Sequence, residues 1–165
     1  SFPERLITSQ PHRGETIHVH VPTHVAGLLQ FASGAVGTLF TTFDVHYWGQ
    51  ARLEVYGAEG TLVCPDPNGF GGPVELYRPE DGTRRELPLL FPYAENSRAL
   101  GLADMAKALR TGRDFRANYQ QQHHVLEILT SFEKSSREGK FIPLTTHYTR
   151  TAPMKNNPMH GILDD

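Results

Sequence analysis

The stretch at residues 24–65, HVAGLLQFASGAVGTLFTTFDVHYWGQARLEVYGAEGTLVCP, most constrains what this chain can fold into. Its runs at 25–31 and 36–43 carry apolar side chains at both odd and even positions, many of them β-branched or aromatic, which predicts strands with two apolar faces. Tight turns are expected at 32–35, where Gly34 can take a positive φ, and at 57–60. A strand with one solvated face would alternate cleanly, so both faces of this sheet need a cover.

Shorter strands flank this stretch. An irregular lead-in at 1–15 precedes them, a Pro- and Gly-rich loop is expected at 65–73, and an extended linker at 89–95. A hairpin turn is predicted at 80–83, where Asp81 precedes Gly82. The remaining strands are expected at 16–21, 74–78, 84–87 and 141–144.

Two helices follow where the apolar period changes. The first is expected to begin at Ser97 as N-cap, to carry Leu100 and Leu109 on its apolar face, and to end at Gly112. The second is predicted at 118–138, ending at Gly139. Its expected apolar stripe consists of Val125, Leu126, Ile128, Leu129 and Phe132.

Strands first and helices later predict an α+β fold: an open-faced, mostly antiparallel β-sheet with two main helices packed on one face. At 165 residues we expect a single domain at 16–145 with a sizeable core, followed by an extended tail at 146–165. Two helices can cover one face of the sheet. The other apolar face is therefore expected to meet a partner domain or a second copy of the chain.

Composition excludes several classes of partner. With 16 basic and 18 acidic residues the formal charge is −2, so we expect no nucleic acid and no anionic membrane as partner. No apolar run approaches the roughly 18 residues of a membrane span. The single cysteine, Cys64, excludes an intrachain disulfide and predicts a reducing, cytoplasmic location. Because the chain starts at Ser1, we expect a trimmed product or part of a longer protein.

Familiar catalytic motifs are absent from the sequence. Gly69 and Gly71 have the first spacing of a dinucleotide-binding loop, but Val74 stands where the third glycine belongs, and a strand is expected to follow. Gly139 and Lys140 are followed by Phe141, so they form no P-loop. No G-x-S-x-G or H-E-x-x-H motif occurs. The residues therefore give no dinucleotide-binding or nucleotide-binding motif, and we expect this chain to bind no such cofactor.

Histidines and aromatic residues supply the candidates for binding. His18, His20 and His24 fall at positions of one parity, a spacing that suits a metal site, although polar residues on an edge strand explain them as well. His124 shares the apolar stripe of the second helix and is either a half-buried, hydrogen-bonded residue or one that points into a substrate cleft. Neither histidine hypothesis excludes its structural alternative.

Further candidates lie near loops. Tyr47 and Trp48 follow a strand and could stack on a sugar ring or fill an interface. Tyr93, Asn96 and Arg98 stand where the linker meets the first helix, a position where loop residues often contact ligands, although Asn96 also suits a helix start. Asp104 is expected on the surface, solvated or ion-paired, and Asp66 is expected to organise its own turn. The proposed cleft residues are Tyr47, Trp48, Tyr93, Asn96, Arg98 and His124.

The series VPTHVAGLLQFASGAVGTLFTTFDV, ARLEVYGAEGTLVCPDPNGFGGPVEL, RALGLADMAKALRTGRDFRA and HHVLEIL resembles the C-terminal part of the Gfo/Idh/MocA oxidoreductases, over about residues 4–145. That family includes glucose–fructose oxidoreductase and inositol dehydrogenases. The resemblance implies a two-domain enzyme. An N-terminal Rossmann domain would bind NAD or NADP, and the C-terminal sheet would complete the substrate site and form a homo-oligomer.

This sequence also departs from the family pattern. The cofactor fingerprint and the Glu-Lys-Pro lysine belong to the N-terminal half, and here Glu133 and Lys134 are followed by Ser135. The family's Asp/His pair lies on a helix that precedes the first strand. None of those residues can be placed on this chain, so the chain alone is predicted to be inactive.

Three hypotheses follow from the sequence. The first is the substrate-side and oligomerisation domain of an NAD(P)-dependent oxidoreductase that acts on a sugar, a cyclitol or a related hydroxyl or carbonyl compound. The second is a stand-alone, non-catalytic binding or assembly module. The third is a histidine-based metalloenzyme.

Overall fold

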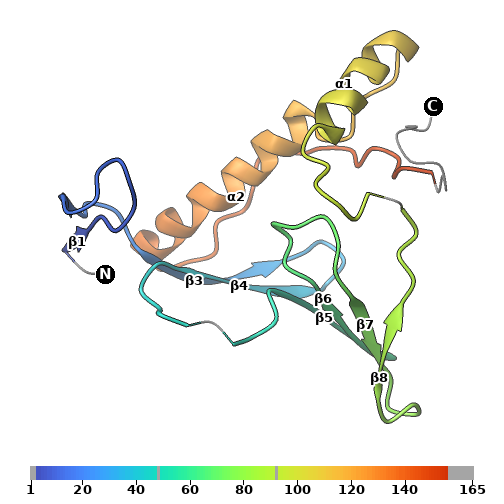
Figure 1. Cartoon of the computed structure of the whole chain (residues 1–165), viewed down its shortest axis with the longest axis horizontal. Coiled ribbons are helices and arrows are strands. Elements are labelled where there is room, and N and C mark those ends of the chain that lie inside the picture. Colours follow the sequence, from blue (N-terminus) through green and yellow to red (C-terminus); the bar gives the residue numbers. More distant parts are fainter. Residues whose placement is uncertain (1–2, 48, 92, 156–165) are drawn as a thin grey trace. The chain divides into compact units, whose positions relative to one another are not determined.

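A computed structural model describes residues 3–47, 49–91 and 93–155 (Figure 1). Ten elements occur in it, eight strands followed by two helices. This order confirms the α+β class. The elements are β1 (Glu4–Leu6), β2 (Thr16–His18), β3 (His24–Gln30), β4 (Val36–Thr42), β5 (Leu53–Gly57), β6 (Gly60–Cys64), β7 (Val74–Tyr77), β8 (Arg84–Leu87), α1 (Leu100–Thr111) and α2 (Tyr119–Glu138).

All strand pairs are antiparallel, as expected, but they form three sheets where the sequence predicted one meander. The pairs β1–β2 and β3–β4 are two-stranded, and β5–β6–β7–β8 is a four-stranded meander. Residues 43–47 and 49–52 between β4 and β5 are irregular. No ladder among the described residues joins β4 to β5, so the predicted continuous sheet is replaced by two strand pairs and a four-stranded sheet.

The predicted turns are confirmed. Phe31 N donates to Ala35 O at 2.9 Å, and Gly34 between them has a φ of 89°. In the second turn Gly57 and Gly60 are cross-strand partners at the end of the β5–β6 ladder. Local chemistry therefore sets the register of these hairpins, because a tight turn leaves a single pairing for the strands on either side.

Of the two helix starts, that of α1 differs from the prediction. Ser97 is not the N-cap of α1: Ala99 holds that position without a side-chain bond, and Ser97 contributes only its carbonyl oxygen to Leu100 N. At α2, Asn118 is buried and its Oδ1 accepts from Gln121 N at 2.9 Å. An asparagine is a favoured N-cap, so this contact fixes where α2 begins.

Three other predicted segments change. The lead-in is not wholly irregular, since Glu4–Leu6 pairs with Thr16–His18. The strand expected at 16–21 is correspondingly shorter, ending at His18. No strand forms at 141–144, where the chain runs on without regular structure.

The chain divides into two compact units, and the division falls inside α2. The first unit consists of Ser1–Trp48 and Leu129–Ile142, and the second of Gly49–Ile128 and Pro143–Asp165. Each unit is described separately below. The boundaries predicted for a single domain at 16–145 stay a prediction.

In the first unit, the β3–β4 hairpin has one covered and one open face. A Cβ built on Gly27 would lie only 2.4 Å from Cε1 of Phe132, so the ring of this α2 residue packs directly on the backbone of β3. Exposure alternates along both strands, with Leu28, Val36 and Phe40 on the open side at 56%, 67% and 39% exposed. An apolar face without a cover is what the sequence predicted.

Apolar side chains are poorly buried in general. Within the described ranges, Ala108 is the one buried hydrophobic residue, at 2% exposure. Of the expected α2 stripe, Val125, Leu126 and Leu129 are exposed, while Ile128 and Phe132 are half-buried. The prediction of a sizeable core is therefore wrong for this chain in isolation. The exposed apolar face of the β3–β4 hairpin is therefore available to another polypeptide surface.

Candidate functional site

The segment before α1 brings three of the predicted site residues to one place in the second unit. Tyr93 is half-buried, and Asn96 and Arg98 are exposed. The guanidinium carbon of Arg98 lies 5.8 Å from the ring centroid of Phe70, within the range of a cation–π contact. The Gly-rich loop thus lies beside the segment that carries these residues.

A glycine makes this approach possible. A Cβ on Gly71 would lie 2.6 Å from the backbone oxygen of Ala94, so only a glycine allows the loop to come this close. Asp66 organises the same loop as predicted: its Oδ1 accepts from Asn68 N at 2.9 Å. The loop runs from β6 into β7, and no helix begins at its end. It therefore lacks the helix N-terminus on which a dinucleotide pyrophosphate would bind.

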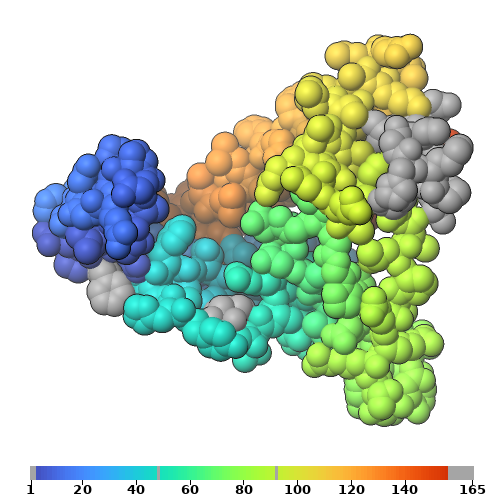
Figure 2. Space-filling view, viewed as in Figure 1, coloured from blue at the N-terminus to red at the C-terminus, as the bar shows by residue number. Residues whose placement is uncertain are grey.

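Two predicted aromatic candidates follow β4 in the first unit. Tyr47 is 86% exposed on the irregular segment that Figure 2 shows in cyan at the surface. Trp48 lies outside the described residues. Tyr47 belongs to the first unit, whereas Tyr93, Asn96, Arg98 and His124 belong to the second.

His124 lies on α2 in the second unit and contacts the irregular segment after Pro143. Its Nδ1 is 2.8 Å from Oγ1 of Thr146, and its ring centroid is 5.4 Å from that of Tyr148, at a tilt of 47°. The imidazole is half-buried. Both readings of His124 survive, since it is hydrogen-bonded and still partly accessible.

Glu127, one helical turn from His124, binds the same segment with its whole carboxylate. Oε1 accepts from Thr145 N at 2.8 Å and from Thr145 Oγ1 at 2.7 Å. Oε2 accepts from Thr146 N at 2.8 Å and from the Thr146 hydroxyl. These donors, the Thr146 hydroxyl foremost, lower the pKa of Glu127 from its ordinary 4.5 to about 2.

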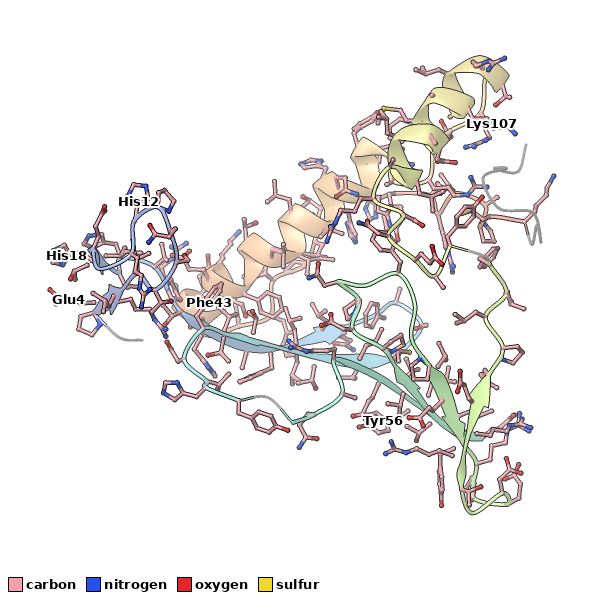
Figure 3. The ribbon with its side chains drawn as sticks, in the orientation of Figure 1. Glu4, His12, His18, Phe43, Tyr56 and Lys107 are labelled. Atoms are coloured by element: carbon pink, nitrogen blue, oxygen red, sulfur yellow. The ribbon has the colours of Figure 1, made fainter. Side chains whose placement is uncertain are left out.

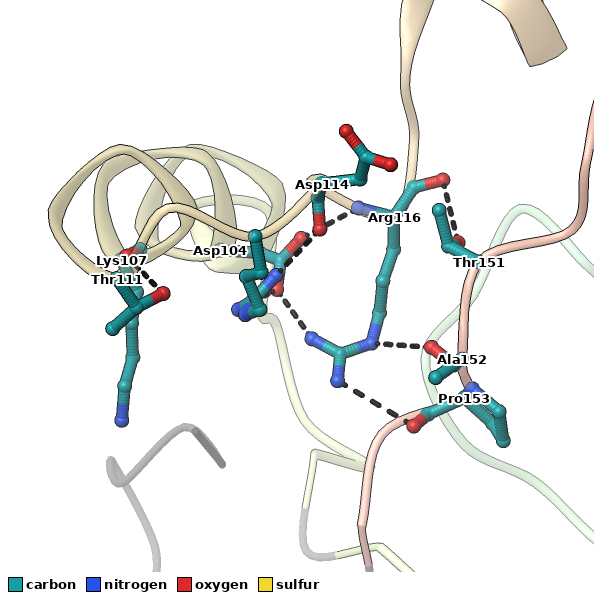
Figure 4. Close-up of polar contacts among 9 residues, drawn as sticks. Asp104, Lys107, Thr111, Asp114, Arg116, Thr151, Ala152 and Pro153 are labelled. Carbon is teal, nitrogen blue, oxygen red and sulfur yellow. Dashed lines mark hydrogen bonds and ion pairs between the residues drawn. The ribbon is translucent and has the colours of Figure 1, made fainter.

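A second polar cluster holds the segment further along (Figure 4). Asp104 is only 6% exposed and accepts from Arg113 Nη2 at 2.7 Å and from Arg116 N at 2.8 Å. Arg116 also donates from Nη1 to Asp104 and from Nε to Ala152 O at 3.1 Å. Burial raises the pKa of Asp104, but the bonds from both arginines outweigh it and the pKa is lowered. The expectation of a surface position for Asp104 is wrong, whereas the expected ion pair is present.

The first unit has a comparable cluster beside β1. Asp44 accepts from Thr23 Oγ1 at 2.6 Å and forms an ion pair with Arg5. Arg5 Nη2 also donates to Phe43 O at 2.6 Å. The hydrogen bond from Thr23 is the main cause that lowers the pKa of Asp44. These bonds join β1 to the residues that follow β4.

The predicted histidine trio does not gather. His18 Nδ1 lies 3.2 Å from Glu4 Oε1 across the β1–β2 hairpin, as Figure 3 shows, while the His24 ring meets Phe40 edge to face. Within the described ranges, no group of three or more His, Cys, Asp or Glu side chains is placed to hold a metal ion. Over the same residues, none of the helices has the length and apolar character to cross a membrane.

Sequence reasoning proposed His124 but gave no signal for the residues that contact its ring or its segment. Glu127 and Thr146 are 19 residues apart, and Arg116 and Ala152 are 36 apart. No local spacing signals such pairs. Glu127 occupies a helix position adjoining the apolar stripe and Thr146 lies in a segment without periodicity, so neither residue stands out before the chain is folded.

Comparison with known families supports the resemblance noted in the sequence. Residues 4–63 match the family model of the GFO/IDH/MocA C-terminal domain. The matched range runs from β1 into β6 and includes the Arg5–Asp44 cluster and the open β3–β4 face. Searches of curated proteins and of solved structures returned no match.

Proposed function

We propose that this chain is the substrate-side and oligomerisation domain of an NAD(P)-dependent oxidoreductase that acts on a sugar, a cyclitol or a related hydroxyl or carbonyl compound. The match of residues 4–63 to the GFO/IDH/MocA C-terminal domain carries the proposal. That segment contains the hairpin whose apolar side is exposed at Leu28 and Val36.

The open β3–β4 face is the proposed contact with a second copy of the chain. Its exposed apolar side chains come from both strands and alternate with covered ones, so they form a surface and not scattered positions. Burying such residues gains about 25 cal/mol for each Å² of apolar surface. The domain buries little of its own apolar surface, and a homo-oligomer would supply the missing cover.

The cofactor, NAD or NADP, is assigned to an N-terminal Rossmann domain outside this chain. The residues present do not fit a dinucleotide, because the glycine loop at 65–73 leads into β7. Hydride transfer requires the nicotinamide carbon and the substrate carbon at about 3–3.5 Å, and the cofactor supplies that chemistry. The 165 residues alone are accordingly expected to show no turnover. The whole enzyme, whose other half would bind the cofactor, is expected in the cytoplasm.

The proposed substrate contacts remain the six residues named from the sequence: Tyr47, Trp48, Tyr93, Asn96, Arg98 and His124. Tyr93, Asn96 and Arg98 share one segment, which supports a common role for them. His124 is supported separately, by its partial exposure and by the residues that hold its ring.

The decisive experiment begins with the mass of the protein in its native source. A native mass near twice the 18.5 kDa of this chain is expected, together with NAD(P)-dependent oxidation of at least one member of a sugar and cyclitol panel. A native mass equal to that of this chain, with polyol binding but no turnover, would overturn the enzyme proposal in favour of a non-catalytic binding or assembly module.

Oligomerisation is tested on the same protein by light scattering. Val36→Lys on the open face should convert the oligomer to a smaller species. Leu109→Lys is the matched control, because Leu109 is 80% exposed on α1, which belongs to the second unit and not to the hairpin. Equal behaviour of the two variants would exclude the open face as the interface.

A further inference from the structure

The hydrogen bonds around Thr146 determine which ring nitrogen of His124 carries a proton. An ionised carboxylate has no proton to give, so the Thr146 hydroxyl must donate to Glu127. A hydroxyl has a single proton. Toward His124 the Thr146 oxygen can then only accept, at 2.8 Å, and Nδ1 must be the protonated nitrogen.

The neutral imidazole therefore presents a lone pair at Nε2. In general, the tautomer of a histidine follows from the hydrogen bond made by its other nitrogen. Among the described residues, no hydrogen bond to Nε2 is present, and the ring is half-buried. Beside it lies the ring of Tyr148, which is 38% exposed. The pair offers one hydrogen-bond acceptor next to an apolar aromatic face.

We propose that Nε2 of His124 accepts a hydrogen bond from a hydroxyl of a polyhydroxylated ring ligand, with Glu127 and Thr146 as positioning residues. The aromatic ring of Tyr148 suits the C–H face of such a ring. The ligand class rests on the proposed function, whereas the tautomer follows from the contacts alone.

Two threonines make a matched pair of variants. Both Thr145 and Thr146 donate a backbone N–H and a hydroxyl to Glu127, but only Thr146 also contacts His124. Thr145→Val and Thr146→Val each remove one hydroxyl bond to the same carboxylate. A role limited to holding the segment would leave the tautomer of His124 the same in the two variants, whereas a role in orienting His124 separates them.

The measurement is the ¹⁵N shift of both ring nitrogens in the histidine-labelled 165-residue chain at about pH 8, where neutral imidazole is generally favoured. His124→Gln assigns the signal among the nine histidines. We expect His124 to be protonated at Nδ1 in the parent chain and in Thr145→Val. In Thr146→Val the two tautomers should mix.

Titration with myo-inositol then tests binding. A saturable shift of the Nε2 signal is expected in the parent chain and in Thr145→Val. The affinity should be about three- to tenfold weaker in Thr146→Val, because the net loss of one hydrogen bond changes an affinity by about that factor. Protonation at Nε2 in the parent chain, identical behaviour of the two valine variants, or no saturable shift of Nε2 would each overturn the inference.

The outcomes separate this inference from the proposed function. Dehydrogenase activity of the native protein without an inositol effect on Nε2 would remove the His124 assignment and leave the oxidoreductase standing. Polyol binding at Nε2 in a protein without dehydrogenase activity would remove the oxidoreductase proposal and leave the His124 assignment standing.

Discussion

The two halves of α2 are held by different chemistry. In the first unit, Phe132 places its ring against the backbone of Gly27 in β3. In the second unit, Glu127 uses both carboxylate oxygens on the N–H groups and hydroxyls of Thr145 and Thr146. The contact of Phe132 needs only an aromatic ring and a glycine, which has no side chain to keep the ring away from the strand. The contact of Glu127 needs four donors at fixed positions, so it orders an otherwise irregular segment.

Arg116 extends the polar half of the comparison. It binds Asp104 on one side and the carbonyl oxygens of Ala152 and Pro153 on the other. Thr151 Oγ1 donates back to Arg116 O at 3.3 Å. The segment after Pro143 is thus anchored at two places by charged groups of helices and loops. Polar anchoring depends on every partner being present, which makes the loss of one partner costly.

Replacing Asp104 should have the largest effect on stability. Asp104→Asn removes the negative charge between two arginines that are each 21% exposed. Breaking a buried pair costs about 3–5 kcal/mol, and the partial exposure of the arginines puts this case near 3 kcal/mol. Urea unfolding measures the loss. The exposed Asp114 supplies the control, since Asp114→Asn changes the same charge and should change stability little. Equal losses in the two variants would show that the buried pair contributes nothing special.

The apolar half of the comparison is tested at Gly27. Gly27→Ala places a methyl group 2.4 Å from Cε1 and 2.6 Å from Cδ1 of Phe132, so the ring or the strand must shift. Overpacking of this kind costs about 1–3 kcal/mol. Gly37→Ala on the paired strand is the control, because its Cβ would lie 3.2 Å from the Phe31 ring and should cost less. A double-mutant cycle with Phe132→Leu should show favourable coupling, and additive effects would disprove the contact.

Local sequence patterns predicted most of the regular structure. The strands β3 and β4, the turn at Gly34 and the end of α2 at Gly139 all follow from residues close together in the chain. Such features depend on backbone geometry that a few neighbouring residues determine. The open β3–β4 face was also predictable, since two helices cannot cover every apolar face of this many strands.

The long-range polar contacts were not predictable in the same way. Asp104 reads as an ordinary surface residue until α1 and the loop at Arg113 are folded around it. Ser97 and Asn118 have similar capping propensity, but only Asn118 aims its side chain at the helix it precedes. The sequence of residues 43–52 carries no strand signal, and it gave no indication that the strands before and after it form separate sheets. For the candidate site, the sequence proposed His124 and gave no signal for Thr146, which contacts its ring, or for Glu127, which binds Thr146.

Acid should weaken the Glu127 anchor, the smallest and most local of the effects. The pKa of Glu127 is depressed to about 2 while the segment is bound and returns to its ordinary 4.5 when it is released. The anchor therefore contributes fully above pH 4.5 and is lost as the pH falls from there through about 2. The amide shifts of Thr145 and Thr146 report this loss directly. A local signal is needed because Asp44 and Asp104 also have lowered pKa values and act in the same direction on the whole chain.

The valine variants sharpen this last prediction. The Thr146 hydroxyl is the largest cause of the lowered pKa and the Thr145 hydroxyl the smallest of the four donors, so Thr146→Val should raise the pKa of Glu127 more than Thr145→Val. Glu127→Gln should abolish the acid transition of the two amides, because an amide side chain does not titrate in this range. If both valine variants moved the transition equally, the polar half of α2 would bind its segment through charge alone. The polar contact would then differ from the apolar Phe132 contact only by the charge of the carboxylate. The positions of the two hydroxyls, including the Thr146 hydroxyl that orients His124, would play no part in holding the segment.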